Sequence, residues 1–350
     1  MSKKVINPFQ KSHNRPFIVA ELSGNHGQSL QKAKKLVNEI AKTGAHAIKL
    51  QTYKPETMTF NIKNKNFMIK NKKNLWKGSY LYDLYKKAYT PWEWHREIFK
   101  LAKKRGMLAF SSVFDDTSIK FLNKIGSPIL KISSFENTDL ELIKNAASTK
   151  KPIIISSGLA SVEELDDAVS IIKKYGSKHF AILKCTSSYP STEKDLNLKT
   201  LLDIKKRYKC KVGFSDHTQD IFAAIGSIAL GAEIIEKHVK LENEKTVDSK
   251  FAITCDKLKL LVDGCNKAYD SLGKKYYGPT KNEVKFLRSR RTLFFNDNLD
   301  KGTIIKKNHI KRARPGLGLK IKYLNRILGK KLKQKVNKGT PVKIKYLKKR

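Results

Sequence analysis

The sequence lacks the features that mark secreted and membrane proteins. Its four cysteines show no CxxC spacing, and no apolar run approaches the length that a membrane-spanning helix needs. The N-terminal segment MSKKVINPFQ is basic but has no apolar stretch of the kind found in secretion signals. We therefore expect a cytoplasmic protein with reduced thiols and no membrane partner.

Acidic residues are scarce, since 31 Asp and Glu stand against 73 Lys and Arg, for a formal net charge of +42. Such an excess suggests nucleic acid or an anionic membrane surface as a partner. However, the excess is mostly lysine and is spread along the expected helices, without the aromatic-rich basic motifs of nucleic-acid modules. A lysine-heavy genomic composition explains it better, so we predict no nucleic-acid partner. A basic nucleic-acid-binding module, the alternative, would bind with a steep dependence on salt.

Short β-branched runs alternate with amphipathic helical stretches over the first three-quarters of the chain. Eight runs are the number that a closed (β/α)8 TIM barrel needs, and we predict this α/β fold in preference to an open doubly wound sheet. An insertion over 54–91 interrupts the alternation, and insertions of that size often shape a substrate site. The eight runs lie at 17–22, 45–53, 108–113, 129–134, 152–157, 181–187, 211–216 and 233–239.

The pattern changes near the C-terminus. Beyond Gly273 the alternation stops, and short strands, turns and glycines follow. We predict a catalytic barrel over 1–275, a linker over 276–286 and a small β-rich domain over 287–350. That last domain is marginal in size for independent stability, so we expect it to pack on the barrel or on a second subunit.

Two histidines stand at matched positions on successive expected strands. In KVGFSDHTQDIFAAIGSIALGAEIIEKHVK, His217 and His238 each follow a buried-strand pattern, with a helix between them. Parallel strands of a barrel carry their active sites at their carboxyl ends, so both imidazoles are expected in one pocket. Converging imidazoles suit a divalent cation such as Mn²⁺ or Zn²⁺. The alternative is one histidine that caps a helix and another that is satisfied in the core.

Lysines also occur inside the expected strands. Alternation in AHAIKLQTY turns Lys49 and Gln51 toward the barrel interior, and Lys131 and Lys184 repeat the arrangement. Buried ammonium groups need anions. Glu21 and Glu236 are available but too few to neutralise three lysines and a metal, so we expect a small ligand that carries phosphate and carboxylate. Lys237, next to His238, should instead face the helices, with its charge solvated or paired.

Serines cluster at the same ends of the strands. Any one of them is usually a helix cap, but together, beside strand-borne lysines, they fit a cradle for an oxyanion. No Walker A or Rossmann glycine pattern competes for that role. The serines are Ser111, Ser112, Ser133, Ser134, Ser156, Ser157, Ser187, Ser188 and Ser215.

At this point the chain resembles a known family. The segments AELSGNHGQSL, AIKLQTY, LKISSFE, PIIISSGLAS, LKCTSSYPS, VGFSDHT, IEKHV and RARPGLG occur in the order seen in the sialic acid synthase family, over nearly the whole chain. The C-terminal region resembles the antifreeze-like (SAF) domain of these enzymes. Within the family, LWKGSYLYDLYKKAYTPWEWH is similar to the branch that makes pseudaminic acid.

The resemblance implies a reaction. Such enzymes condense phosphoenolpyruvate with the open aldehyde form of an N-acetylated amino sugar and release phosphate. For this branch the sugar is 2,4-diacetamido-2,4,6-trideoxy-L-altrose. A divalent ion, Mn²⁺ or a relative, is expected between His217 and His238, where it polarises the aldehyde.

The resemblance also implies site residues. Arg314 matches the antifreeze-domain arginine that the neighbouring subunit supplies, which implies a domain-swapped homodimer. Glu21 could orient a sugar hydroxyl or carry a proton, and these alternatives stay open. The positions that match phosphoenolpyruvate contacts are Lys49, Ser112, Lys131, Ser134, Ser156 and Ser215, and those on the sugar side are Glu21, Gln51, Tyr189 and Asp248.

Two other activities remain possible at this level. The same chemistry on an N-acetylneuraminate or legionaminate precursor would use the same residues. A metal-dependent aldolase that takes pyruvate would release no phosphate.

Overall fold

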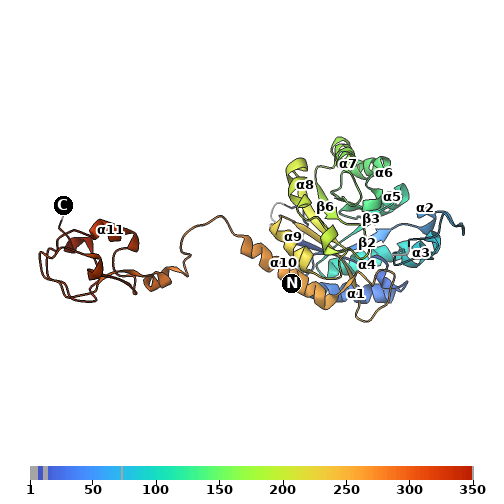
Figure 1. Cartoon of the computed structure of the whole chain (residues 1–350). Helices are drawn as coiled ribbons and strands as arrows, with labels where there is room; N and C mark the ends of the chain where they lie inside the picture. Colours follow the sequence, from blue (N-terminus) through green and yellow to red (C-terminus); the bar gives the residue numbers. More distant parts are fainter. Residues whose placement is uncertain (1–6, 11–14, 72–73, 349–350) are drawn as a thin grey trace. The chain divides into compact units, whose positions relative to one another are not determined.

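The computed structural model describes residues 7–10, 15–71 and 74–348 of the chain (Figure 1). It divides into two compact units, residues 1–273 and 274–350. Within the described ranges, none of the helices combines the length and the hydropathy that a bilayer crossing requires.

The first unit is a closed barrel of eight parallel strands, as predicted. Each strand pairs with the next along the chain, and β1 pairs with β8 to close the sheet. All eight runs expected from the sequence are strands. They are β1 (Phe17–Glu21), β2 (Ala47–Thr52), β3 (Leu108–Val113), β4 (Leu130–Ile132), β5 (Ile153–Ser156), β6 (Phe180–Cys185), β7 (Lys211–Asp216) and β8 (Ile234–Lys240), and a short β9 (Ile253–Thr254) continues beside β8.

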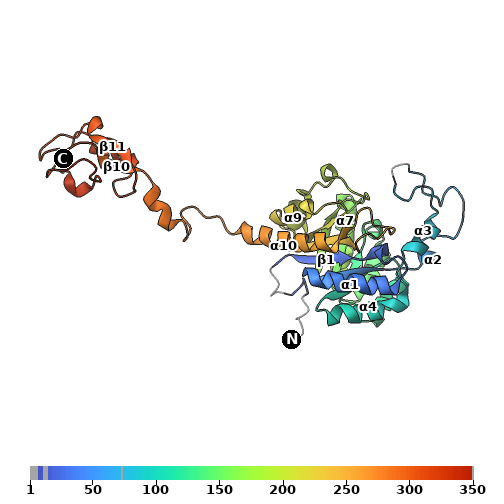
Figure 2. The ribbon, with the colours of Figure 1, turned by 90° about the horizontal axis from the view of Figure 1, so that it is seen from below.

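Helices surround this sheet (Figure 2). Local signals in the sequence set their ends: Ser29 accepts a hydrogen bond from Lys32 N at the start of α1, and Gly44 ends the helix at φ 86°. The helices of the unit are α1 (Leu30–Thr43), α2 (Pro55–Met58), α3 (Leu81–Ala88), α4 (Trp92–Lys104), α5 (Asp116–Lys124), α6 (Leu140–Ser148), α7 (Val162–Tyr175), α8 (Thr200–Tyr208), α9 (Phe222–Ala229) and α10 (Cys255–Leu272).

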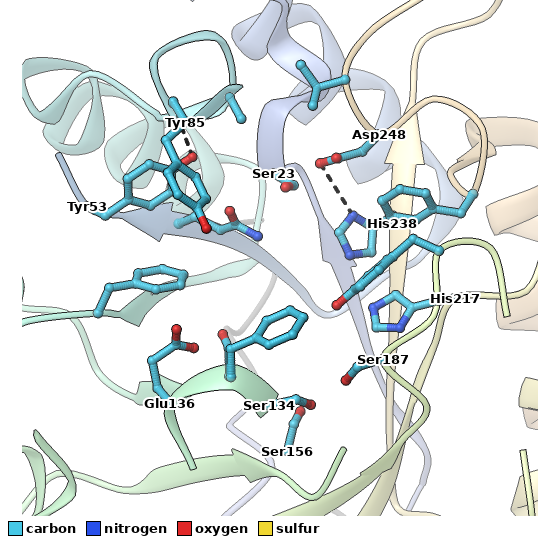
Figure 3. Close-up of a pocket in the computed structure, with 18 of the residues that line it drawn as sticks. Ser23, Tyr53, Tyr85, Ser134, Glu136, Ser156, Ser187, His217, His238 and Asp248 are labelled. Atoms are coloured by element: carbon cyan, nitrogen blue, oxygen red, sulfur yellow. Dashed lines mark hydrogen bonds and ion pairs between the residues drawn. The ribbon is translucent and has the colours of Figure 1, made fainter. Parts of the chain in front are cut away.

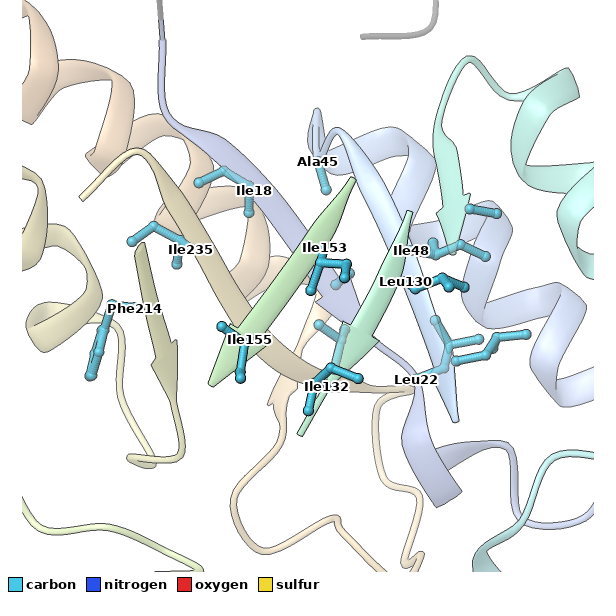
Figure 4. Packing of buried hydrophobic residues seen from close by; sticks show 14 of the residues in the cluster. Ile18, Leu22, Ala45, Ile48, Leu130, Ile132, Ile153, Ile155, Phe214 and Ile235 are labelled. Carbon is cyan, nitrogen blue, oxygen red and sulfur yellow. The ribbon is translucent and has the colours of Figure 1, made fainter. Parts of the chain in front are cut away.

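Strand alternation separates two hydrophobic layers. Side chains that point outward, among them Ile18, Ile48, Leu130, Ile153 and Phe214, pack against the helices (Figure 4). Side chains that point inward fill the lower part of the barrel, and these include Phe17, Val19, Phe110, Leu183 and Ile234. The apolar filling closes the bottom of the barrel, so that polar inward positions are left only near the carboxyl ends of the strands.

Gly213 shows how tightly the barrel interior is packed. A Cβ atom at this position would lie 2.3 Å from the carbonyl oxygen of Ile234 and 2.5 Å from Leu183 Cδ2. Only glycine lets β7 approach its neighbours this closely. The close approach sets the spacing of the two strands that lead to His217 and His238.

The second unit is small and has its own core. Its strands β10 (Thr292–Phe295) and β11 (Ile310–Ala313) pair antiparallel, and isolated β-bridges join the surrounding turns. A short helix α11 (Leu324–Ile327) contributes to a core that includes Leu293, Phe295, Ile305, Leu332 and Val342. The short strands and turns agree with the β-rich character predicted for this region. Arg314 directly follows β11, and its side chain is exposed.

Candidate active site

A cavity of about 510 Å³ opens at the carboxyl ends of the barrel strands (Figure 3). Most residues singled out in the sequence line it. Glu21 and Ser112 do not, but both are fully buried and contact Lys49 behind the lining. Arg314 belongs to the second unit and is not among the lining residues. The predicted residues that line the cavity are Lys49, Gln51, Lys131, Ser133, Ser134, Ser156, Ser187, Tyr189, Ser215, His217, Glu236, His238 and Asp248.

The two histidines lie side by side, with ring centroids 5.3 Å apart. His217 Nδ1 is 3.0 Å from the carbonyl oxygen of Thr186. This contact assigns the proton to Nδ1 and leaves Nε2 available as a ligand. His238 Nδ1 is buried without a hydrogen-bond partner, and the nearest carboxylate oxygen, Oδ2 of Asp248, is 3.9 Å away.

The protonation of the pair bears on cation binding. Burial, with His217 and nearby lysines adding to it, holds the pKa of His238 well below its ordinary value, so this imidazole is neutral. Burial also acts to lower the pKa of His217, but Cys185, 3.8 Å away, outweighs it and leaves that pKa raised. A cation that binds His217 therefore competes with protonation of that imidazole.

The residues present fit a divalent cation in part. His238 offers an orphaned buried nitrogen and His217 a free one, and nitrogen donors of this kind suit Mn²⁺ or Zn²⁺. Among the described residues, however, no group of three or more His, Cys, Asp or Glu side chains is arranged as a metal site. Water or substrate oxygens would have to complete the coordination.

Behind the histidines, an ion pair ties their two strands together. Asp216 and Lys237 are register partners on β7 and β8, and their oppositely charged atoms are 2.8 Å apart with both side chains fully buried. Lys237 Nζ also donates to the carbonyl and hydroxyl oxygens of Thr218. Lys237 thus faces away from the cavity, as predicted, and its charge is paired rather than solvated. Because each of these residues adjoins a histidine in the chain, the pair holds both imidazoles in place.

Two lysines and two carboxylates form the charged floor of the cavity. Lys49 Nζ lies 2.7 Å from Glu21 and 3.6 Å from Glu236, and Lys131 Nζ lies 3.7 Å from Glu236. Serine hydroxyls extend the network: Lys49 donates to Ser112 at 3.1 Å, Lys131 to Ser156 at 2.6 Å, and Ser215 to Glu236 at 3.1 Å. Oε2 of Glu236 has no hydrogen-bond partner although it is buried.

The structure corrects the interpretation of Lys184. Ala181, Leu183 and Cys185 are the inward residues of β6, so Lys184 points to the outer side, where its Nζ donates to Cys185 O and Thr186 Oγ1. The sequence interpretation mistook the phase of this strand. With two interior lysines rather than three, Glu21 and Glu236 can balance the ammonium charges when both are ionised.

Burial of the carboxylates favours a net positive charge on the floor of the cavity. Loss of solvent raises the pKa of Glu21 to about 7, although Lys49 opposes the shift. For Glu236, burial acts in the same direction, but Lys131 and Lys49 outweigh it and keep its pKa below the ordinary value. When Glu21 carries a proton, the two ammonium groups face a single carboxylate. The floor can then accept an anion.

Aromatic side chains surround the imidazoles. The ring of Tyr189 lies 4.5 Å from that of His217, and Phe251 lies 4.8 Å from His238. Asp248 accepts a hydrogen bond from Gly24 N at 3.2 Å, which fixes the carboxylate at the rim. Gln51 lines the cavity from β2, in phase with Lys49.

Sequence reasoning missed several residues of the cavity. Cys185 is an inward position of β6, in phase with Ala181 and Leu183, and strict alternation along that strand would have found it. Glu136 lies on a short 3-10 turn (Ser134–Glu136), and Trp76 lies in the insertion. In neither place does a strand periodicity predict the direction of a side chain. Oε2 of Glu136 is shielded from solvent without a hydrogen-bond partner.

Glu136 gives a test of stability against pH. Burial raises its pKa to about 7, against the opposing effect of Lys131. Because the folded state holds this proton more tightly than the unfolded state does, the protonated carboxyl group stabilises the fold at pH values below the pKa of the unfolded state. This stabilisation is lost as the pH rises through about 7. The difference in melting temperature between Glu136→Gln and the parent chain should therefore shift in favour of the variant, by a few degrees, when the pH is raised from 5 to 8. Thermal melts at pH 5 and at pH 8 measure this difference. A difference in melting temperature that is the same at both pH values would contradict the expectation.

The fold and cavity together define a class of protein: a (β/α)8-barrel enzyme with a cationic cavity for a small anionic substrate, followed by a separate β-rich unit. The truncated 3-deoxy-D-arabino-heptulosonate 7-phosphate synthase of Thermotoga maritima has this barrel fold, at a TM-score of 0.57 and 16% identity over 78% of this chain and 95% of that chain. The chain belongs to the NeuB family, whose model matches residues 36–277, and a SAF domain matches residues 290–347.

Relatives of known name agree with this assignment. The chain is 40% identical to the pseudaminic acid synthase of Helicobacter pylori, over 93% of this chain and 96% of the relative. It is 39% identical to the pseudaminic acid synthase of Campylobacter jejuni, over 93% and 95%. Among solved structures, the N-acetylneuraminic acid synthetase of Leptospira borgpetersenii, in complex with citrate, matches at a TM-score of 0.70 and 32% identity, over 79% of this chain and 92% of that chain.

Proposed function

We propose that this protein is a pseudaminic acid synthase, which condenses phosphoenolpyruvate with 2,4-diacetamido-2,4,6-trideoxy-L-altrose and releases phosphate. The observation that carries the proposal is the cavity, in which two interior lysines and a set of serines lie beside paired imidazoles. The high identity to pseudaminic acid synthases over nearly their whole length supports the choice of sugar.

The floor of the cavity binds phosphoenolpyruvate in this proposal. Lys49 and Lys131 neutralise its phosphate and carboxylate, and the hydroxyls of Ser134, Ser156 and Ser215 donate to its oxygens. Ser112, behind the lining, acts through its hydrogen bond with Lys49. The lysines already lie in a network of serine and carboxylate partners, so they are ordered before the substrate arrives. Ordered donors need little reorganisation as charge develops during the reaction.

The sugar then lies above phosphoenolpyruvate, with its aldehyde toward His217 and His238. Gln51, Tyr189 and Asp248 contact its polar groups. The imidazoles would hold a divalent ion, Mn²⁺ or a relative, which when bound supplies the Lewis acid that polarises the aldehyde oxygen.

The reaction joins C3 of phosphoenolpyruvate to the aldehyde carbon. Water adds to the electron-poor C2, and the resulting tetrahedral centre loses phosphate by cleavage of its C–O bond. Glu21, with a pKa of about 7, is suited to take up a proton near neutral pH. Its contact with Lys49 supports a proton transfer at the phosphoenolpyruvate end of the cavity.

A direct assay tests the proposal. The full chain is incubated with phosphoenolpyruvate, Mn²⁺ and the altrose derivative, and released phosphate is measured against a reaction without sugar. We expect phosphate release and a product whose mass equals pseudaminic acid. N-acetylmannosamine and a legionaminic acid precursor serve as competing sugars, and pyruvate replaces phosphoenolpyruvate to test for an aldolase. No phosphate above the sugar-free reaction would contradict the proposal.

We further propose that the enzyme works in the cytoplasm as a domain-swapped homodimer, with Arg314 of one subunit completing the site of the other. The SAF match to residues 290–347 supports this role for the second unit.

Truncation tests the role of the second unit. A chain that ends before Leu287 should keep the circular dichroism of the barrel, because residues 1–273 form their own compact unit. We expect its turnover to fall about a hundredfold or more, since a positioning contact is lost. Adding full-length His217→Ala protein should restore activity if the second unit acts in trans. Full activity of the truncated chain alone would contradict the prediction.

A further inference from the structure

One wall of the cavity comes from a single insertion between β2 and α4. This insertion spans 54–91, and residues 72 and 73 lie outside the described ranges. It contains α2 and α3 and a loop that extends from the barrel (Figure 2). Backbone hydrogen bonds from Ile69 N to Ser79 O, at 3.0 Å, and from Gly78 N to Ile69 O, at 2.9 Å, give the loop a defined shape.

The insertion contributes almost only apolar and aromatic surface to the cavity. Asn74 is the single amide among its described lining residues, and none of those residues is charged. This contrasts with the floor, where lysines, serines and carboxylates alternate. The principal apolar residues of this wall are Met58, Ile69, Trp76, Leu81, Leu84 and Tyr85.

Specific contacts hold the wall against the barrel. Trp76 Nε1 donates to the carbonyl oxygen of Val247 at 3.1 Å, and the indole lies 6.0 Å from Tyr189. At the other end, Tyr53 on the barrel side donates from its hydroxyl to Tyr85 O at 3.3 Å, with the two rings 5.8 Å apart. The insertion is therefore fixed at two points and forms a fixed part of the cavity.

The two ends of the wall differ in their distance from the imidazoles. Trp76 lies beside Tyr189, which contacts His217, whereas the Tyr85 end lies away from the reacting end of the cavity. Figure 3 shows Tyr53 and Tyr85 on the opposite side from His217 and His238. A sugar whose aldehyde carbon is beside the imidazoles directs its last carbon, C6, toward that opposite side. The side chains of the wall are only partly buried, so they keep apolar surface that a ligand can cover.

We propose that this insertion determines substrate specificity by selecting a sugar with a methyl group at C6. The inference rests on the proposed function. It identifies the part of the chain that distinguishes a 6-deoxy sugar from its 6-hydroxy counterpart. Met58 and Leu84 offer a methyl group apolar contact but offer a hydroxyl no partner. A hydroxyl that is buried here loses its hydrogen bonds to water and gains none from the protein. This loss disfavours binding of the 6-hydroxy sugar.

The size of the discrimination follows from the chemistry. Apolar pockets separate substrates that differ by one small group by about 10- to 200-fold in kcat/KM. We expect the parent protein to prefer the 6-deoxy sugar within that range. Binding of phosphoenolpyruvate at the floor should not depend on the wall, because the lysines and serines of the floor come from the barrel strands.

The experiment compares matched variants of the full chain. Leu84→Gln and Met58→Gln replace apolar lining residues by polar ones of similar size. Ile62→Gln makes the same kind of change in the same insertion, at an exposed residue that does not line the cavity. For each protein, kcat/KM and the dissociation constant, the latter by calorimetry with phosphoenolpyruvate present, are measured for the 6-deoxy sugar and its 6-hydroxy analogue.

We expect the preference for the 6-deoxy sugar to fall about tenfold or more in the two lining variants. It should stay unchanged in Ile62→Gln, and KM for phosphoenolpyruvate should change in none of them. An equal preference in Leu84→Gln, Met58→Gln and the parent chain would overturn the inference. If phosphate is released with neither sugar, the proposed function fails. The ratio of the two dissociation constants still tests whether the wall prefers the 6-deoxy sugar.

Discussion

His217→Ala and His238→Ala are each expected to lower turnover by about a thousandfold or more. Each substitution removes one of two adjacent nitrogen donors and leaves a single imidazole to hold the ion. Both side chains lie in the wall of the cavity and not in the apolar filling of the barrel. The melting temperature should therefore remain within a few degrees of the parent value.

Binding and activity need separate measurements for this pair. Calorimetric titration with Mn²⁺ should show strong binding by the parent chain and at least tenfold weaker binding by each variant. The matched control is His179→Ala, which removes an exposed imidazole that precedes β6, at the opposite end of the barrel. Full activity of either cavity variant after removal of metal would contradict the assignment.

Lys131→Met is expected to raise KM for phosphoenolpyruvate and to lower kcat/KM by about a hundredfold or more, as loss of one partner in a buried charge pair does. The ammonium donates to Ser156 and lies 3.7 Å from Glu236, so the variant loses a cation and leaves a carboxylate facing the anionic substrate. The KM for the sugar should change much less. Steady-state kinetics with each substrate varied in turn measures both effects.

Lys184→Met provides the matched control, because this lysine occupies the same kind of strand position but points away from the cavity. It should retain the parent KM for phosphoenolpyruvate. If Lys184→Met and Lys131→Met impair the enzyme equally, or if Lys131→Met impairs only the sugar, the proposed orientation of phosphoenolpyruvate is wrong. Circular dichroism checks that Lys131→Met is folded.

The sequence predicted the barrel because its strands carry a strong local pattern. Runs such as 17–22 and 211–216 are bounded by polar residues and separated by helices with clear caps, such as Ser29 and Gly44. It also placed Lys49 and Gln51 correctly on the inner face of β2, since the two residues share a phase with buried Ala47.

The same reasoning failed at Lys184, which it placed on the inner face of β6, whereas the inward residues are Ala181, Leu183 and Cys185. Successive side chains of a strand point to opposite faces, so an error of one residue in the phase reverses every side chain. Nearly every residue of β6 is apolar or half-buried, so alternation is weak there and the phase cannot be read from polarity. The packing of Leu183 against the barrel interior decides it.

Local sequence was sufficient for the elements and their order, because hydrophobic periodicity and helix caps act over a few residues. It also marked the paired histidines, because their spacing follows from a βαβ unit. The insertion wall, the ion pair of Asp216 with Lys237 and the direction of Glu136 depend on contacts between segments far apart in the chain. Such contacts form only when the barrel closes, and burial then sets both the charge of the floor and the shape of the cavity.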